Sequence, residues 1–276
     1  MKIIKKKNAE VLSEELFCKK TYIYDIWHKY HLKEGKRTYA LNENYFEKID
    51  ADEKAYFLGL IAADGCLYIK SKGQNIVKIA IQIKDIKILN KFSMAIQTDK
   101  PLSISRGKYC SLEIVSNQIF NDLYRLGLKP NKTFGNSFVL LEDRYMNHFL
   151  RGYFDGDGSI TCGKKDKLPS STIVSFSGYQ TNMSKISEYL ERHYIFSNFN
   201  IDKRKYNGES NFGNLYFHGI NSKYALMKYL YHNANDFYLD RKYELAKNFM
   251  EQIEKDNKNN SKETIIYYNK IVKETM

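Results

Sequence analysis

The sequence predicts an α+β protein that contains two copies of one αββαββα unit, preceded by a small helical segment. Three observations support this prediction. Apolar and polar residues alternate along residues 75–84, which is typical of a strand with one buried face. A helical pattern that ends in Asp-Gly occurs twice, at Asp64 and at Asp157, a separation of 93 residues. The elements that follow each Asp-Gly recur in the same order, which indicates an internal duplication.

The composition limits the possible functions. With 276 residues the chain is long enough for one large domain or two to three small ones. Its 44 basic and 32 acidic residues give a net charge of +12. This excess favours a polyanionic partner, such as DNA, RNA or an anionic membrane face, although a merely lysine-rich composition would also produce it.

Targeting and metal signals are weak in this sequence. No long apolar run suggests a secretory signal or a membrane span, so we expect a protein that is not secreted and has no membrane partner. We expect it in the cytoplasm, if bacterial or phage-encoded, or in an organelle. The four cysteines form no CxxC pair and the six histidines are scattered, so neither a zinc site nor a disulfide framework is predicted.

Residues 1–40 are basic and helical in pattern. Apolar residues at positions 23, 26, 27 and 30 share one helical face. A short helix, a turn and a second helix that starts near Thr21 predict a helix-turn-helix segment that binds DNA. A helical extension that packs on the main body remains the alternative.

The first αββαββα unit starts after this segment. Asp50 and Glu53 have the spacing of a capping box, which predicts a helix over residues 54–64 that ends at Gly65. The strand over 75–84 should place four residues in the core: Val77, Ile79, Ile81 and Ile83. A helix over 85–96, a hairpin over 102–116 and a helix over 117–127 complete the unit. On the hairpin we expect four residues to face inward: Ile104, Cys110, Leu112 and Ile114.

The second unit repeats this order. We predict a helix over 144–157, strands near 160 and over 172–178, a helix over 184–193, strands over 196–206 and 215–220, and a helix over 222–231. The chain has only three prolines and no Gly/Ser/Pro-rich linker, so the units should abut closely. The expected domains are 1–40, 41–139 and 140–256, followed by a polar tail over 257–276.

The two Asp-Gly helices carry a physical argument for a metal site. Gly59 and Gly152 lie mid-helix, where glycine costs about 1 kcal/mol relative to alanine. A helix accepts that cost where another backbone comes close, so the two helices should pack side by side and present Asp64 and Asp157 at the same end. Two carboxylates at helix C-termini repel each other and oppose the helix dipoles, which favours bound cations. Carboxylate oxygens suit Mg²⁺. The alternative is that each Asp-Gly only ends a helix.

The two helix ends read FLGLIAADG over 57–65 and LRGYFDGDG over 150–158. Both resemble the LAGLIDADG motif, the signature of the LAGLIDADG homing endonucleases in their two-motif, single-chain form. The resemblance implies a monomeric, site-specific double-strand DNA endonuclease, encoded by a mobile element such as an intron and needing no protein partner. It implies Mg²⁺ or Mn²⁺ in a metal site that comprises Asp64, Asp157, Ala63 and Gly156.

The motifs depart from the family pattern at three positions that bear on the site. Ala62 replaces the first acid of the first motif, while Asp155 keeps it in the second. Arg151 replaces a small residue, and we expect its side chain to point away from the contact between the helices. Gly156 replaces alanine and should add flexibility. Both second acids, which the family uses for metal, are retained.

The resemblance also implies a basic residue from each unit near the cleaved phosphates, for which we select Lys132 and Lys242. The outward faces of the two sheets would form a saddle for the duplex, and Gln82 could order a water near the metals. The expected DNA contacts are Lys78, Gln82, Lys84, Tyr109, Ser175, Ser177, Tyr216 and His218.

Two other functions remain open. The same fold serves non-catalytic nucleic-acid binders, namely intron maturases and helix-turn-helix regulators. A decayed element that folds but cleaves nothing is a further alternative. The paired acids favour a nuclease, because a protein that only binds nucleic acid has no need for two repelling carboxylates.

Overall fold

The computed structural model describes residues 9–29, 39–70, 73–130, 138–162, 169–201 and 212–260. The chain divides into two compact units, Met1–Ala40 and Leu41–Met276. The first unit contains α1 (Ala9–Glu15) and α2 (Lys20–Lys29), joined by a short turn.

The second unit begins with the first αββαββα repeat. Its elements are α3 (Asp52–Asp64), β1 (Gly65–Ile69), β2 (Asn75–Gln82), a 3₁₀ turn η1 (Ile83–Asp85), α4 (Ile86–Ala95), β3 (Ser103–Ser105), β4 (Tyr109–Val115) and α5 (Asn117–Arg125). The strands form an antiparallel sheet in the order β1-β2-β4-β3. We call it sheet A.

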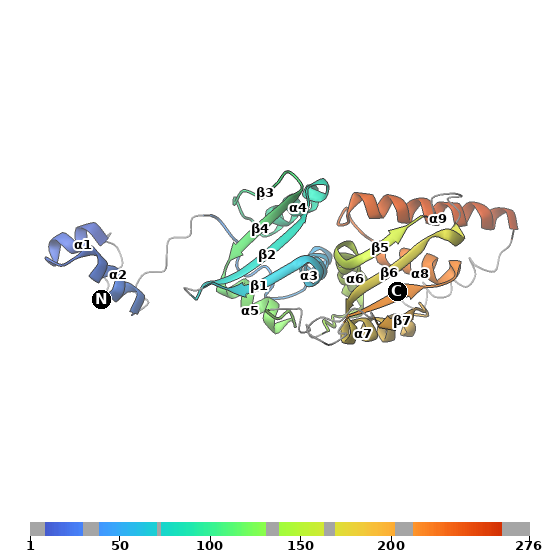
Figure 1. Ribbon diagram of the computed structural model, residues 1–276, viewed down its shortest axis with the longest axis horizontal. Helices are drawn as coiled ribbons and strands as arrows, with labels where there is room; N and C mark the ends of the chain where they lie inside the picture. Colours follow the sequence, from blue (N-terminus) through green and yellow to red (C-terminus); the bar gives the residue numbers. More distant parts are fainter. Residues whose placement is uncertain are drawn as a thin grey trace. The chain divides into compact units, whose positions relative to one another are not determined.

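The second repeat has the same order. Its elements are α6 (Asp143–Asp157), β5 (Gly158–Thr161), η3 (Pro169–Ser171), β6 (Ile173–Tyr179), α7 (Gln180–Arg192), β7 (Asn198–Ile201), β8 (Phe212–Phe217) and α8 (Ile220–Tyr231). The strands form sheet B in the order β5-β6-β8-β7, also antiparallel. The predicted α+β class with two αββαββα repeats is confirmed (Figure 1). A long helix that the sequence analysis missed, α9 (Asp240–Asn260), follows the second repeat.

One hydrophobic core runs through both repeats, and α3 and α6 pack against each other within it. Every residue of α3 from Ala55 to Ala63 is buried, so this helix has no polar face. The inner faces of the sheets cover the helices with alternating apolar residues, as predicted for Val77, Ile79 and Ile81. This burial fixes the two motif helices at the centre of the unit.

The predicted capping box at the start of α3 is wrong. The N-cap residue is Ala51, which has no side-chain acceptor. Asp50 instead pairs with Lys54, with 2.8 Å between the carboxylate and the ammonium. Glu53 accepts a hydrogen bond from the Tyr45 hydroxyl at 3.4 Å. The two acids therefore stabilise the helix start through side chains rather than through its free N–H groups.

Two predictions for sheet A also fail. β2 ends at Gln82, and Lys84 lies in the 3₁₀ turn that follows rather than on the strand face. Ile104 is 62% exposed, because β3 is a three-residue edge strand whose residues are all open to solvent. Cys110, Leu112 and Ile114 are buried on the neighbouring strand, as predicted.

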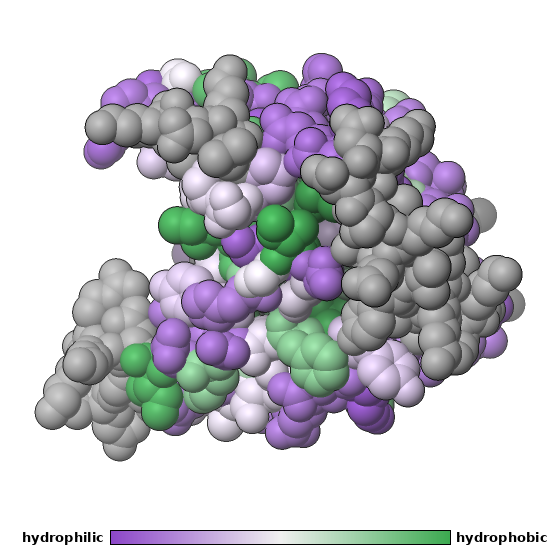
Figure 2. All heavy atoms as spheres, turned by 90° about the vertical axis from the view of Figure 1, so that its right-hand side faces the viewer, coloured by the Kyte–Doolittle hydropathy of each residue, from purple (hydrophilic) through white to green (hydrophobic). Residues whose placement is uncertain are grey.

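Among the described residues, no helix is both long and apolar enough to span a bilayer. Figure 2 shows hydrophilic and hydrophobic residues interspersed on the face that it presents. The tail beyond residue 260 lies outside the described residues.

Candidate active site

The backbones of α3 and α6 touch at two glycines. A Cβ on Gly59 would lie 2.0 Å from the carbonyl oxygen of Phe149 on α6, and a Cβ on Gly152 would lie 2.0 Å from that of Tyr56 on α3. Each glycine thus faces the residue three positions before the other glycine. This reciprocal contact, which we call the helix seam, aligns the two helices so that their last residues end together.

The two helices end at Asp64 and Asp157, and strands β1 and β5 begin at the next residues, Gly65 and Gly158. A side chain at Gly65 has no room, because its Cβ would lie 2.3 Å from the carbonyl oxygen of Ile61. Glycine therefore lets the chain pass from helix to strand with no loop. Each acid is held between two rigid elements.

The two helix ends converge. The Oδ2 atom of Asp64 lies 3.2 Å from the point that a Cβ on Gly156 would occupy, one residue before Asp157. The Cβ of Ala63 lies 2.3 Å from the same point. Gly156 therefore serves close packing rather than the flexibility that we expected. Asp64 is half-buried and Asp157 is exposed, so both of the acids that end the helices are accessible to solvent.

Lys242, from the first turn of α9, lies under the end of α6. Its side chain is only 4% exposed. The ammonium donates to the backbone carbonyls of Phe154, Asp155 and Gly158, at 2.6, 2.7 and 2.6 Å. These carbonyls belong to the last turn of α6 and the residue after it, where a helix lacks internal donors. Lys242 therefore fixes the turn that carries Asp157.

Burial lowers the pKa of Lys242 to about 8, while the charges of Asp155, Asp64 and Asp157 act to raise it. The amine remains mostly protonated at neutral pH, and its charge interacts with the carboxylates of both Asp64 and Asp157. Lys242 was expected to lie at the phosphates, but its ammonium is already held by backbone carbonyls. Lys132, the equivalent choice in the first repeat, lies outside the described residues.

Asp155 is a second buried acid on α6. Its Oδ2 atom accepts hydrogen bonds from the Tyr56 hydroxyl at 2.7 Å and from the backbone N–H of Leu239 at 2.9 Å. Its Oδ1 atom is buried and has no hydrogen-bond partner among the described residues. Burial raises the pKa of Asp155 to about 6, against the stabilising charge of Lys242. This carboxylate therefore links α3, α6 and the segment before α9.

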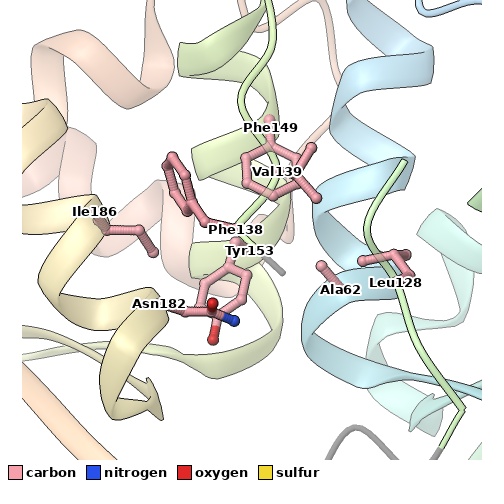
Figure 3. Close-up of a pocket in the computed structure, with 8 residues that line it drawn as sticks. All are labelled: Ala62, Leu128, Phe138, Val139, Phe149, Tyr153, Asn182 and Ile186. Atoms are coloured by element: carbon pink, nitrogen blue, oxygen red, sulfur yellow. The ribbon is translucent and has the colours of Figure 1, made fainter. Parts of the chain in front are cut away.

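The opposite edge of the helix seam is apolar. With an offset of 93 residues, Ala62 is the counterpart of Asp155 and Phe149 is the counterpart of Tyr56. Ala62 and Phe149 both line a small cavity of about 10 Å³ (Figure 3). The acid and the hydroxyl are thus both absent on this edge. A buried carboxylate that lacks its hydrogen-bond donor would lower the free energy of unfolding. We therefore expect the carboxylate and the hydroxyl to be either both present or both absent at an edge.

The raised pKa of Asp155 predicts a pH-dependent stability. The folded state holds the proton more tightly than the unfolded state, so the stability from this group is complete below the unfolded pKa and is lost as the pH rises through about 6. Relative to Asp155→Asn, the wild type should lose roughly 2–3 kcal/mol of unfolding free energy between about pH 4 and pH 7. Urea unfolding of both proteins across this range measures it.

Tyr56→Phe is the matched control for this prediction, since it reproduces the residue present at the opposite edge. Removing the hydroxyl removes a donor to the ionised form of Asp155, so the pH-dependent loss should move to higher pH. A constant difference between wild type and Asp155→Asn at every pH would contradict the prediction.

Arg151 is fully buried beside the helix seam. Its guanidinium donates to the carbonyls of Phe237 and Leu230, at 2.7 and 2.8 Å, and lies 2.9 Å from Nδ1 of His148. It therefore leaves the glycine contact free, as expected. Its guanidinium still meets α3, because it lies 5.4 Å from the centre of the Tyr56 ring.

The segment before Lys242 is also tied to the first repeat. Arg241 pairs with the buried carboxylate of Asp85 at 3.1 Å, and Asp240 pairs with Lys87 at 2.8 Å. These contacts join the start of α9 to η1 and α4. The position of Lys242 under α6 therefore depends on both repeats.

The outer faces of the sheets are polar. Lys78, Gln82 and Tyr109 lie on the outer face of sheet A, as predicted, and the pairing puts Gln82 beside Tyr109. Ser177 and Tyr216 lie on the outer face of sheet B, and His218 is exposed just beyond β8. The outer residues of sheet B are uncharged in its described part: Ser159, Thr161, Ile173, Ser175, Ser177, Tyr179, Asn198, Asn200, Phe212, Asn214 and Tyr216.

Ser175 is a correction to the predicted contacts. It lies on the outer face of sheet B, but it is only 8% exposed, because it is on a central strand between Ser159 and Tyr216. Its neighbours leave little of this residue accessible to a bound duplex, so Ser175 is not part of the proposed interface.

A charged cluster on sheet A was not predicted from the sequence. The carboxylate of Glu113 accepts from the Tyr68 hydroxyl at 2.7 Å and from the Lys70 ammonium at 2.8 Å. These hydrogen bonds, with that of Lys70 the larger influence, lower the pKa of Glu113. The outward parity of Tyr68 and Glu113 on their strands was a signal that could have revealed the cluster.

The acids at the end of the helix seam fit a hard divalent cation. Among the described residues no group of three or more His, Cys, Asp or Glu is placed to hold a metal, which disfavours a closed zinc-type site there. Mg²⁺ is usually held by one or two carboxylates together with waters and substrate phosphates. Two carboxylates from neighbouring helix ends match that requirement.

These features define a class of protein: two αββαββα repeats whose Asp-ending helices pack on each other's glycines. Residues 144–230 match the family model of the LAGLIDADG-like domain. The resemblance noted from the motifs is thus confirmed, and the fold is that of the single-chain LAGLIDADG homing endonucleases. A search of curated protein sequences finds no match.

The fold is similar to that of the meganuclease I-SmaMI bound to uncleavable DNA with a TTGT central four. The identity is 12% and the TM-score 0.52, covering 79% of this chain and 94% of that one. I-LtrWI, a LAGLIDADG homing endonuclease bound to target DNA, matches with 13% identity and a TM-score of 0.48, covering 83% and 97%. I-SmaMI bound to uncleaved DNA in the presence of calcium ions matches with 13% identity and a TM-score of 0.48, covering 79% and 96%.

Proposed function

We propose that this protein is a site-specific endonuclease that cuts both strands of a DNA duplex with the help of a divalent cation. The observation that carries the proposal is the convergence of Asp64 and Asp157 at one end of the helix seam. Two like charges at adjoining helix C-termini repel each other, and each also opposes a helix dipole. A bound divalent cation would offset both of these effects.

Asp64 and Asp157 would hold Mg²⁺ or Mn²⁺, together with the residues that precede them, Ala63 and Gly156. When bound, the cation supplies an activated water and charge stabilisation for the leaving oxygen of a phosphodiester. The chain itself supplies rigidity, since each acid lies between a helix and a strand. Lys242 acts as a positioning residue, because it holds the turn that carries Asp157.

The DNA would lie along the outer faces of sheets A and B. Lys78 and Lys84 supply positive charge for phosphates, and the hydroxyl and amide groups of sheet B suit base edges. Proteins with this fold include a meganuclease bound to DNA, which supports the same substrate here. We propose that one chain is sufficient, because it contains both motif helices. We extend the proposal to a role in a mobile element. The protein would then act in the compartment that contains the target gene.

The test is a cleavage screen with the full chain on a library of duplexes that carry randomised inserts. With Mg²⁺ or Mn²⁺ we expect double-strand breaks in one related set of sequences, and with a chelator we expect none. Sequencing the ends of the products gives the site and the cut positions. Tight binding to a selected duplex or RNA without breaks in either metal would overturn the nuclease and favour a non-catalytic binder or maturase.

A further inference from the structure

The first unit, Met1–Ala40, is not used by the site described above. Ten basic and five acidic residues give it a net charge of +5, out of +12 for the whole chain. This charge density on 40 residues is far above that of the remainder. That excess lies in residues 1–8 and 30–40, which flank the helices and carry +6, while residues 9–29 carry −1, so the flanking segments would supply the attraction to a polyanion.

The two helices of this unit are joined by a turn of defined geometry. Four residues, 16–19, separate α1 from α2. Phe17 has a φ of 47°, in the left-handed region, and the N–H of Cys18 returns to the carbonyl of Ser13 at 3.1 Å. This pattern ends α1 and redirects the chain at once. A helix, a turn of three to four residues and a second helix form the helix-turn-helix arrangement.

The packing within the unit fits the same arrangement. Leu12 of α1 and Ile23 of α2 are buried against each other, and Cys18 of the turn packs on them. The start of α2 is left open, with Lys20, Thr21 and Tyr22 all exposed. The buried contact therefore orients α2 so that its first residues face solvent.

The exposed residues at the start of α2 have the chemistry of a DNA-reading surface. Lys19 and Lys20 can pair with phosphates, and the Thr21 hydroxyl can meet either base type. Tyr22 is an aromatic residue 59% exposed, and Asp25 offers a carboxylate to a cytosine amine. In helix-turn-helix proteins the second helix enters the major groove with its first residues on the base edges.

We propose that the helix pair α1–α2 is a second DNA-binding site, in which the first residues of α2 read the major groove of the duplex that the second unit cleaves. Eleven residues, 30–40, join α2 to the second unit, and such a chain reaches at most about 35–40 Å, or roughly one turn of duplex. The inference rests on the proposed function only in that both sites bind the same duplex. The recognised DNA sequence would then extend beyond the base pairs that sheets A and B contact.

The first experiment measures the binding of the full chain to a labelled duplex of random sequence as a function of salt. Lys19→Ala/Lys20→Ala should reduce the slope of log affinity against log salt by about 2, since each phosphate contact contributes about 0.9. Lys247→Ala/Lys255→Ala removes the same charge from exposed positions on α9 and serves as the matched control. The proposal would be overturned if the two variants gave the same dependence of log affinity on log salt.

The second experiment selects bound sequences from a randomised duplex library with wild type and with Thr21→Ala/Tyr22→Ala. The wild type should enrich an extended site, and the variant should lose one block at a single end while it keeps the rest. An unchanged site would overturn base reading by α2. Cleavage at the remaining block tests the nuclease separately, because these substitutions leave Asp64 and Asp157 intact. Loss of the end block with no cleavage by either protein would therefore sink the nuclease alone.

Discussion

Replacing Asp64 or Asp157 by asparagine should abolish double-strand cleavage while DNA binding survives. Asparagine keeps the shape of the side chain but removes the charge that holds a cation. Loss of a metal ligand removes several kcal/mol of transition-state stabilisation, so the rate should fall by about a thousand-fold or more. Rapid-quench cleavage assays and anisotropy binding on the selected site measure the two quantities separately.

The control for this prediction is Asp256→Asn, which removes one acid from an exposed position near the end of α9. It should cleave at the wild-type rate. Equal cleavage by the Asp64→Asn protein and the wild type would refute the assignment of the site. Loss of binding together with cleavage would assign the acids to the structure rather than to the metal.

Gly59→Ala or Gly152→Ala should destabilise the protein severely. Each added Cβ would lie 2.0 Å from a backbone carbonyl oxygen on the opposing helix. The added methyl group fits only if the helices move apart, because a helical carbonyl group cannot rotate away as a side chain can. We expect a loss of more than about 3 kcal/mol, well beyond the gain of about 1 kcal/mol in helix propensity. Urea unfolding measures the change.

Gly156→Ala provides a matched comparison at the end of the same helix seam. Here the added Cβ would meet the Cβ of Ala63 at 2.3 Å, which is a side chain and not a backbone. The exchange Gly156→Ala/Ala63→Gly moves the methyl group from one helix to the other and should recover most of the loss. No partner substitution should rescue Gly59→Ala. If Gly59→Ala is as stable as the wild type, the close helix contact does not exist in solution.

Much of the architecture could be predicted from local patterns. The strand over 75–84 and the helix ends at Gly65 and Gly158 depend on residues close in sequence, so periodicity and Asp-Gly signals found them. The duplication appeared because both copies keep their glycines and second acids. The edge strand β3 was predicted, but the exposure of Ile104 was not, since local alternation does not reveal which strand lies at an edge.

The surroundings of the acids could not be predicted in the same way. Lys242 was selected for its place after the last helix of the second repeat, but its hydrogen bonds go to carbonyls 84 to 88 residues away. Tyr56 and Asp155 are 99 residues apart and meet only because the helices pack in register. The sequence did hold a signal for this pair. At an offset of 93 residues both partners are replaced together, by Phe149 and Ala62, but such a joint replacement is not part of any motif.

The sequence by itself determined the repeated αββαββα order, the two glycine-bearing helices and the acids that end them, because these depend on spacing along the chain. The tertiary structure alone decided how those acids are held. It brought Asp64 beside the end of α6, placed Lys242 under that end, and made one edge of the helix seam polar and the other apolar. Those features depend on which side chains meet across the core, and a buried charge is stable only where the fold supplies its partner.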